Sequence, residues 1–403
     1  SWEANAFLAN NTAEDDGGGV YLTEYSTASW EAGAFFSDNA AADNGGAVFI
    51  WKGSDASWKN EAFFINHAAG NHGGAVYIAI QAEAVLKGGA SFHYNSASGD
   101  GGAFYLYDGY HRSNPSSLVL NGHGTFLGNT CKGNGGAMAL TAAANVTFGA
   151  HNVSFIENTA DQAGGAVAIR DVHTGPQFIG VNFISNTAQI GGAVHATGSG
   201  GALAVDEHGN LMSSPSTFKW CRFIGNKASA TGGAVNSAAG VDAFEDALFV
   251  GNTATAGGAL RLAGEAFLDN CTFSDNLSMD DEGPAISNVG FISGIVRSSF
   301  SANYFQCQRS SFLDFTPGTS DDLFSIVCKG CNTECEDCRI PGENFQCNSE
   351  MENARSPGGN TTLETLRISR GFWRATGDSK KILPCYSAEA CRGGLTGAPD
   401  YCS

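Results

Sequence analysis

Two adjacent glycines followed by a small or apolar residue recur along most of this chain. The first four copies begin at Gly17, Gly45, Gly73 and Gly101, so they lie 28 residues apart. Later copies begin at Gly135, Gly164, Gly191, Gly232 and Gly257, and a degenerate copy begins at Gly283. A unit repeated in this way buries its apolar face only by stacking on its neighbours, so the spacing predicts a repeat architecture.

A second motif precedes each glycine pair and consists of an aromatic residue or Leu, two spacers and an Asn. Ten copies occur at a mean spacing of about 29 residues. The copies are Leu8 with Asn11, Phe36 with Asn39, Phe64 with His67 in place of Asn, Phe92 with Asn95, Phe126 with Asn129, Phe155 with Asn158, Phe183 with Asn186, Phe223 with Asn226, Phe249 with Asn252 and Phe273 with Asn276.

The segments around these motifs favour strands over helices. They are short, rich in aromatic and β-branched residues, and bounded by Gly and Asn, as in the stretches that start at Gly45 and Ala62. Helix start and stop signals are missing. With 54 glycines, 27 phenylalanines and only 9 prolines, the composition also fits a packed, turn-rich β structure. We therefore expect an all-β fold.

Small residues stand at a fixed phase in every copy, two before the aromatic residue and two after the Asn, as Ala34 and Ala41 do around Phe36 and Asn39. We expect period-2 alternation to place them on the same face as the aromatic residue and the Asn, inside a narrow coil with one large filler in each layer. Equivalent residues would then stack about 4.8 Å apart as Phe and Asn ladders. The sequence predicts a right-handed parallel β-helix of about ten to eleven coils over residues 1–306, about 50 Å long.

Two of the gaps between glycine pairs contain insertions, one with residues 110–115 and the other with residues 198–216. We expect these insertions to be loops at coil corners, where specific binding would occur.

The 12 cysteines are distributed unevenly. Only Cys131, Cys221 and Cys271 precede position 300, and their phase predicts small, buried, free thiols. The other nine are Cys307, Cys328, Cys331, Cys335, Cys338, Cys347, Cys385, Cys391 and Cys402. Such crowding predicts a disulfide-stapled module over residues 307–403 in an oxidising environment, because a zinc site would need a wider gap between its cysteine pairs.

The alternation of Phe-x-x-Asn with Gly-Gly-Ala-Val or Ile over residues 1–303 resembles the repeats of the polymorphic outer-membrane protein family, in the form found in algae and other protists. The tail from Cys328 to Cys347 is similar to ephrin-receptor-like modules, and the segment from Gly371 to Cys402 to EGF-like segments. The resemblance implies structural or adhesive work outside the cell and no catalytic residue. The bacterial members of the family carry a membrane barrel where this chain has its cysteine-rich tail.

The net charge of −19 argues against nucleic acid and anionic membranes as partners. An acidic surface can bind divalent cations weakly, so weak Ca²⁺ binding at Glu14, Asp15 and Asp16, or at residues 280–282, is the single metal hypothesis. No run of about 18 apolar residues occurs, and we expect no membrane insertion in this segment.

Many β-helices are polysaccharide enzymes, so three polar clusters are candidate catalytic sites. They are Arg170 and Asp171 with His173, residues 206–208, and residues 280–282. Each lies in a different loop and none repeats at one phase on neighbouring coils, which favours solvated loops. We expect no enzyme activity, no catalytic residue and no cofactor.

Six Asn residues begin an Asn-x-Ser/Thr sequon. Asn276 belongs to the inward ladder and should be a poor acceptor of a glycan. Asn10, Asn145, Asn152, Asn270 and Asn360 are the predicted sites of N-linked glycans, and glycosylation would itself indicate secretion.

The first functional hypothesis is an extracellular structural subunit of a cell-surface layer or filamentous appendage, such as a flagellar hair or surface fibril. Its partners would be copies of itself or other β-helical surface subunits. The alternative is an adhesin that binds glycan or protein through corner loops, and the third hypothesis is a polysaccharide-active enzyme.

Overall fold

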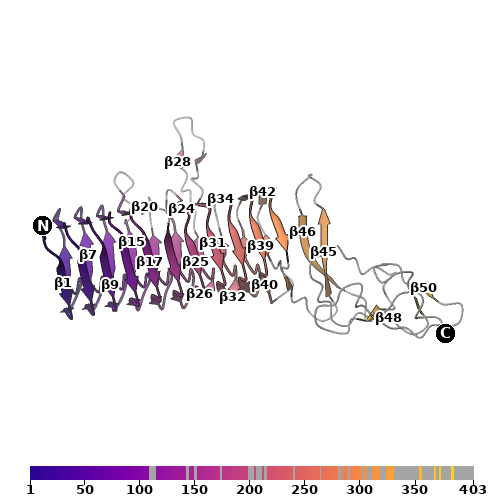
Figure 1. Cartoon of the computed structure of the whole chain (residues 1–403), viewed down its shortest axis with the longest axis horizontal. Coiled ribbons are helices and arrows are strands. Elements are labelled where there is room, and N and C mark those ends of the chain that lie inside the picture. Colours follow the sequence, from indigo (N-terminus) through magenta and orange to yellow (C-terminus); the bar gives the residue numbers. More distant parts are fainter. Residues whose placement is uncertain are drawn as a thin grey trace.

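A computed structural model shows an all-β chain organised as a parallel β-solenoid (Figure 1). The structure describes residues 1–305 except 109–114, 142–144, 149–151, 173–174, 198–203, 206–210, 213–215, 239–240, 264, 280–282, 284, 289–290 and 302–303. Beyond residue 305 it describes only six short strands. Within these described residues there is no α-helix.

Four parallel sheets run along the rod, and each coil contributes one strand to each sheet. We name them the Phe sheet, the short sheet, the Gly sheet and the Trp sheet. The Phe sheet carries the phenylalanines of the repeated motif, and the Gly sheet follows the glycine pairs. The Phe and short sheets have 11 strands each, and the Gly and Trp sheets have 10 each. In Figure 1 the strands succeed one another along the long axis from the N-terminus.

The strands of the Phe sheet are β1 (Ala6–Ala9), β5 (Ala34–Ser37), β9 (Ala62–Ile65), β13 (Ala90–His93), β17 (Gly124–Leu127), β21 (Val153–Ile156), β25 (Asn182–Ile184), β31 (Arg222–Ile224), β35 (Leu248–Val250), β39 (Thr272–Ser274) and β43 (Ser299–Ser301). Those of the short sheet are β2 (Thr12–Ala13), β6 (Ala40–Ala41), β10 (Ala68–Ala69), β14 (Ser96–Ala97), β18 (Thr130–Cys131), β22 (Thr159–Ala160), β26 (Thr187–Ile190), β32 (Lys227–Thr231), β36 (Thr253–Ala254), β40 (Leu277–Ser278) and β44 (Tyr304–Phe305). Those of the Gly sheet are β3 (Val20–Leu22), β7 (Val48–Trp51), β11 (Val76–Ala79), β15 (Phe104–Tyr107), β19 (Met138–Thr141), β23 (Val167–Arg170), β27 (Val194–Thr197), β33 (Val235–Ser237), β37 (Leu260–Leu262) and β41 (Ile286–Asn288). Those of the Trp sheet are β4 (Thr27–Trp30), β8 (Asp55–Trp58), β12 (Glu83–Leu86), β16 (Ser117–Leu120), β20 (Asn145–Phe148), β24 (Gln177–Ile179), β30 (Ser216–Lys219), β34 (Val241–Glu245), β38 (Glu265–Asp269) and β42 (Phe291–Val296).

The remaining strands form antiparallel pairs outside the four sheets. The pair β28 (Ala204–Val205) and β29 (Leu211–Met212) lies in the insertion expected at residues 198–216, and Figure 1 shows it projecting from the rod. The other pairs are β45 (Ser311–Pro317) with β46 (Phe324–Gly330), β47 (Ala354–Arg355) with β48 (Arg367–Ile368), and β49 (Phe372–Trp373) with β50 (Leu383–Pro384). Of the nine cysteines expected in disulfides, Cys328 lies in β46, and the other eight lie outside the described residues.

In the first four coils, residues 28 apart in the sequence pair directly in the sheets. Phe36 lies beside Phe64 and Ala34 beside Ala62. Insertions leave this register intact, because Phe178 still pairs with Phe218 across the insertion that contains β28 and β29. Equivalent side chains therefore stack in columns along the rod.

Simple alternation does not explain why the ladder Asn points inward, and that part of the expectation was wrong. Asn39 follows Phe36 by three residues, so strict period-2 alternation would put these two side chains on opposite faces. The residue just before each ladder Asn, or before His67, adopts a left-handed conformation in all ten copies, with φ between 53° and 63°. These residues are Asn10, Asp38, Asn66, Tyr94, Gly128, Glu157, Ser185, Gly225, Gly251 and Asp275. This corner turns the chain and brings the Asn inside.

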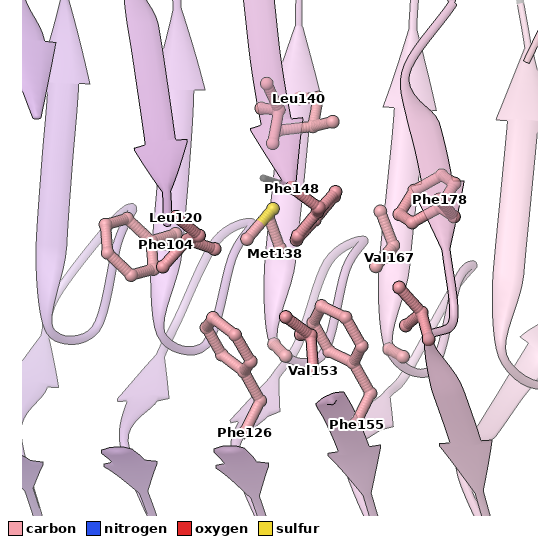
Figure 2. Close-up of a cluster of buried hydrophobic side chains, with 14 of the residues drawn as sticks. Phe104, Leu120, Phe126, Met138, Leu140, Phe148, Val153, Phe155, Val167 and Phe178 are labelled. Carbon is pink, nitrogen blue, oxygen red and sulfur yellow. The ribbon is translucent and has the colours of Figure 1, made fainter. Parts of the chain in front are cut away.

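The core contains at least three columns of large side chains, whereas the sequence suggested one large filler in each layer. One comes from the Phe sheet, one from the Trp sheet, and one from the Gly sheet, which includes Ile50, Ile78, Leu106 and Leu140. The rings from Phe36 to Phe300 in the Phe sheet stack with centroids 4.6–5.2 Å apart and planes within 11°. A second column in the Trp sheet contains Trp30, Trp58, Leu86, Leu120, Phe148, Phe178, Phe218, Phe244 and Leu268. The Phe-sheet and Trp-sheet columns meet edge to face, as at Trp30 and Phe36, whose ring centroids lie 5.7 Å apart. Figure 2 shows Phe126 and Phe155 of the Phe sheet with Phe148 of the Trp sheet.

The two glycines of each pair have different roles. The first has a left-handed backbone, as at Gly73 with φ +65°. The second has no such strain, but it lies against the next coil. A Cβ on Gly74 would fall 2.5 Å from the carbonyl oxygen of Ser96 and would clash with the carbonyl of Gly102. The pair therefore both turns the corner and allows the coils to approach each other closely.

Replacing the second glycine should destabilise the fold more than placing a side chain on a left-handed backbone does. We expect Gly74→Ala to lower the free energy of unfolding by about 3 kcal/mol or more, because two backbone segments must move apart. Gly251→Ala is the control, since Gly251 has φ +63° but no heavy atom within 4 Å of its would-be Cβ. It should cost about 1–2 kcal/mol. Urea unfolding followed by circular dichroism measures both changes. Equal losses would contradict the claim that the second glycine is required for the close approach of two coils.

Candidate functional site

The Asn ladder at the corner between the Phe sheet and the short sheet is the most regular polar feature of the rod. The ladder Asn residues from Asn39 to Asn276 are buried and bond to neighbouring coils, whereas Asn11 in the first coil is exposed. The Asn129 Oδ1 atom accepts from the backbone N–H of Asn95 at 3.0 Å and from its Nδ2 at 2.9 Å. The Asn129 Nδ2 group donates to Phe92 O and to Asn158 Oδ1, both at 2.9 Å. The pattern extends through Asn158, Asn186, Asn226, Asn252 and Asn276. This column holds the coils in register.

His67 occupies one rung of this ladder. Its Nδ1 atom accepts from the backbone N–H of Asn39 at 3.0 Å, and its own N–H donates to Asn95 Oδ1 at 3.0 Å. Burial lowers the pKa of His67 to about 4, although hydrogen bonds with Asn39 and Phe36 act in the opposite direction. The imidazole is therefore neutral near pH 7, and it can accept as an Asn oxygen does.

A buried carboxyl group lies in the Trp sheet. Asp242 is only 3% exposed, and burial raises its pKa to about 6, against the effect of the Ser237 hydroxyl. Because its folded pKa is above the ordinary value of 3.8, stability from this group falls as the pH rises from about 4 to about 6. The group lies inside the coil, where a substrate would have no access.

The three early cysteines are buried free thiols, as the sequence predicts. Burial raises the pKa of Cys131 and of Cys221 to about 12 and that of Cys271 to about 11. Cys221 and Cys271 each contact the carbonyl oxygen of a Trp-sheet phenylalanine, Phe178 and Phe244. A thiol in this state is a packing group rather than a nucleophile.

A second polar ladder lies at the other end of the short sheet, at the corner just before the glycine pairs. It contains Asp16, Asn44, His72, Asp100 and Asn134, and each side chain accepts the backbone N–H of the next member. In the next two coils Ala163 and Ile190 take this position.

The acidic cluster near the start of this ladder differs from the expected one. Asp15, Asp16 and Asp43 bring carboxylate oxygens within 4.8 Å of one another, so the third member is Asp43 rather than Glu14. Burial raises the pKa of Asp16, while its bonds to Asn44 lower it. Asp16 already accepts two hydrogen bonds from Asn44, which would compete with a bound cation for its Oδ1 atom. Weak Ca²⁺ binding here stays a prediction. Residues 280–282 lie outside the described part of the chain.

The outer face of the Gly sheet carries a column of rings that ends abruptly. Tyr21, Phe49, Tyr77 and Tyr105 stack with centroids 5.0, 5.0 and 5.4 Å apart. In the next two coils the column continues with Ala139 and Ala168, and then with His195. A hollow of about 160 Å³ lies there. Its polar lining is Asp100, Asn134, Thr141, Arg170, His195 and Thr197.

The outer face of the Phe sheet carries an apolar column, which we name the isoleucine stripe. Its members are half-buried and lie in register on five successive coils. They are Leu127, Ile156, Ile184, Ile224 and Val250. At the strand spacing of about 4.8 Å, the stripe is about 19 Å long and parallel to the rod.

Of the candidate catalytic residues named from the sequence, only Arg170 and Asp171 belong to the described part of the chain. Arg170 lines the hollow, whereas Asp171 lies at the following corner, exposed and with φ 53°. His173 and residues 206–208 lie outside the described residues.

The predicted glycan sites that are described lie at coil corners. Asn10, Asn152 and Asn270 are exposed and left-handed, with φ of 55°, 82° and 52°. Asn270 also donates to Asp246 Oδ1 at 2.6 Å. Asn276 is buried, and its Nδ2 donates to Phe249 O, which agrees with its expected inaccessibility. Asn145 begins β20, where only the backbone is described, and Asn360 lies outside the described residues.

No family model, curated protein or solved structure matches this chain. The resemblance to the polymorphic outer-membrane protein repeats therefore depends on the motifs alone. The part of the chain that the structure describes contains no helix able to span a membrane.

The ladder Asn residues satisfy buried polar groups of neighbouring coils, so removing one should be costly. Asn129→Ala leaves the Asn95 N–H and the Phe92 carbonyl without these partners. At about 1–3 kcal/mol for each unsatisfied buried group, we expect a loss of about 3–5 kcal/mol in the free energy of unfolding. Asn121→Ala, at an exposed position of the same coil, should change it by about 0.5 kcal/mol or less. Denaturant unfolding measures both, and a loss below about 1 kcal/mol for Asn129→Ala would contradict the ladder's role.

His67 should make the rod sensitive to acid. Its folded pKa of about 4 lies below the ordinary histidine value of 6.5, so the unfolded chain binds the proton more readily. Stability from this group is present above pH 6.5 and is lost as the pH falls toward 4, by up to about 3 kcal/mol. We expect the stability advantage of His67→Asn over the wild type to grow across this window. Unfolding of the wild type and of His67→Asn at several pH values tests this. Because both chains contain Asp242, its opposite pH dependence cancels when one free energy of unfolding is subtracted from the other. A difference that does not change with pH would be the contrary result.

Proposed function

We propose that this protein is an extracellular structural subunit of a cell-surface layer or filamentous appendage, such as a flagellar hair or surface fibril, and that it assembles through self-association. The isoleucine stripe carries this proposal. Contiguous apolar surface outside a folded core is typical of interaction sites. Because every copy carries the same straight stripe, two rods can pack side by side with two-fold symmetry and cover both stripes.

The interior of the rod supports a mechanical rather than a chemical role. The stacked rings and ladder amides occupy the coil from end to end, and their contacts go to neighbouring coils. Ion pairs on the surface also join adjacent coils, as Lys52 with Glu24 at 2.9 Å and Lys219 with Glu245 at 2.6 Å. A rod joined in this way transmits force along its axis without needing a binding partner inside.

The extracellular location is supported by the exposed sequons at Asn10, Asn152 and Asn270 and by the cysteine-rich tail. We retain a disulfide-stapled module of the ephrin-receptor-like or EGF-like kind over residues 307–403 as part of the proposal. We also retain a right-handed coil, because parallel β-strand crossovers are almost always right-handed.

Sedimentation velocity on the intact glycosylated protein tests self-association, with electron microscopy of the same samples. We expect concentration-dependent dimers or longer polymers for the wild type. Ile184→Lys should shift the protein to monomers, because it places a charge in the centre of the stripe, while circular dichroism stays unchanged.

Thr187→Lys is the matched control, because Thr187 is exposed in the same coil but on the outer face of the short sheet. It should assemble like the wild type. A wild-type protein that stays monomeric at every concentration, or Ile184→Lys polymers identical to those of the wild type, would count against the proposal.

The alternative function, an adhesin that binds glycan, is favoured by one observation, the hollow beside Ala139 and Ala168. This location differs from the corner loops suggested by the sequence.

A further inference from the structure

The ring column on the outer face of the Gly sheet is missing two members. Tyr105 pairs with Ala139, Ala139 with Ala168, and Ala168 with His195. The column positions of Tyr105 and His195 are therefore three coils apart, or about 14 Å. Two alanine methyl groups stand where the preceding coils carry rings such as those of Tyr77 and Tyr105, so the space beside the alanines stays open.

Polar groups converge on this space from both sides. Asp100 and Asn134 come from the corner ladder, and Thr141, Arg170 and Thr197 come from the neighbouring outer column of the Gly sheet. The Asp100 carboxylate accepts two hydrogen bonds from Asn134, at 2.7 and 3.0 Å, which fixes its position. His195 lies at the far end, and burial lowers its pKa to about 4, so it is neutral near pH 7.

Arg170 is the exposed cation of the hollow. Within the described residues it forms no ion pair, and the four cation–carboxylate pairs that involve Lys or Arg lie elsewhere on the rod. A guanidinium group presents five donors in a planar fork, which suits carboxylates and vicinal hydroxyl groups.

The size and lining of the hollow select the kind of ligand. At about 160 Å³ it is smaller than sites for drug-sized molecules, so it can take one ring of a larger chain. An aromatic ring from a partner would cover the Arg170 guanidinium without giving it a hydrogen-bond acceptor, which is costly. A sugar ring has an apolar face for the alanine floor and hydroxyl groups around its rim for the walls.

We propose that this hollow binds one pyranose unit of a glycan, with the ring over Ala139 and Ala168 and its substituents bonded to Asp100, Asn134 and Arg170. The site is independent of self-association through the isoleucine stripe, which lies on a different sheet. A rod with both features would bind polysaccharide along the side of an assembly.

The test uses the full-length protein and immobilised oligosaccharides in two sets, neutral hexoses and uronic acids, followed by titration calorimetry with the best binder of each set. We expect binding in at least one set. Ala139→Tyr should lower the affinity about tenfold or more, because it extends the ring column into the hollow. Folding should persist, since the preceding coils hold Phe49, Tyr77 and Tyr105 at this position, and circular dichroism checks it.

Ser91→Tyr is the matched control, because it adds the same side chain to the outer face of the Phe sheet, next to Phe63. It should leave affinity unchanged. Arg170→Ala distinguishes the two sets: it should weaken uronic-acid binding about tenfold or more and neutral-sugar binding less.

Three results would overturn the proposal. One is the absence of binding in both sets, and another is glycan binding that survives Ala139→Tyr. The third is that an indole probe binds in the hollow and no sugar does, which would assign the site to an aromatic side chain of a partner protein.

Discussion

The fold depends on the hydrogen bonds that each ladder Asn makes to the coils before and after it. A backbone N–H at the corner between the Phe sheet and the short sheet points along the rod, and a buried donor without a partner is costly. The side-chain oxygen of the next Asn accepts it, while the Nδ2 group satisfies a carbonyl in the previous coil. Because these bonds require equivalent residues to lie directly above one another, they exclude shifts in register between coils.

Once the register is set, every other column follows from it. The Phe and Trp columns stack at the strand spacing, and the glycine pairs keep the coils close enough for that stacking. The described interior side chains thus hold the coils together, and the candidate binding surfaces lie on the outer faces of the sheets. The isoleucine stripe is an apolar column on the outer face of the Phe sheet, and the hollow is a gap in the ring column of the Gly sheet. Outer columns can vary in this way without disturbing the ladders.

The sequence predicted the parts of the fold that repeat with the same residue type. The Phe and Asn positions, the strands and the small inward residues could be read from ten copies of one motif. The second polar ladder could not, because its positions hold Asp16, Asn44, His72, Asp100 and Asn134, which share a hydrogen-bonding role rather than a residue type.

The Trp column shows a related difficulty. Trp2, Trp30 and Trp58 are in phase in the sequence, but Leu86 and Leu120 follow, so the column becomes visible only through strand pairing. The hollow was also missed, because its signal is the small size of Ala139 and Ala168 relative to the rings before them. An inward Asn three residues after an inward Phe requires a left-handed residue between them, which the variable residue types at that position conceal.

The most direct test of the ladder is hydrogen exchange of the Asn side-chain amides, followed by nuclear magnetic resonance on protein labelled at Asn. The account predicts that the Nδ2 protons of Asn95, Asn129 and Asn158 exchange about as slowly as core backbone amides, since both require opening of the coil. The exposed Asn121 provides the fast reference. Exchange of the ladder amides as fast as that of Asn121 would contradict a buried column of stacked amides and the rod built on it.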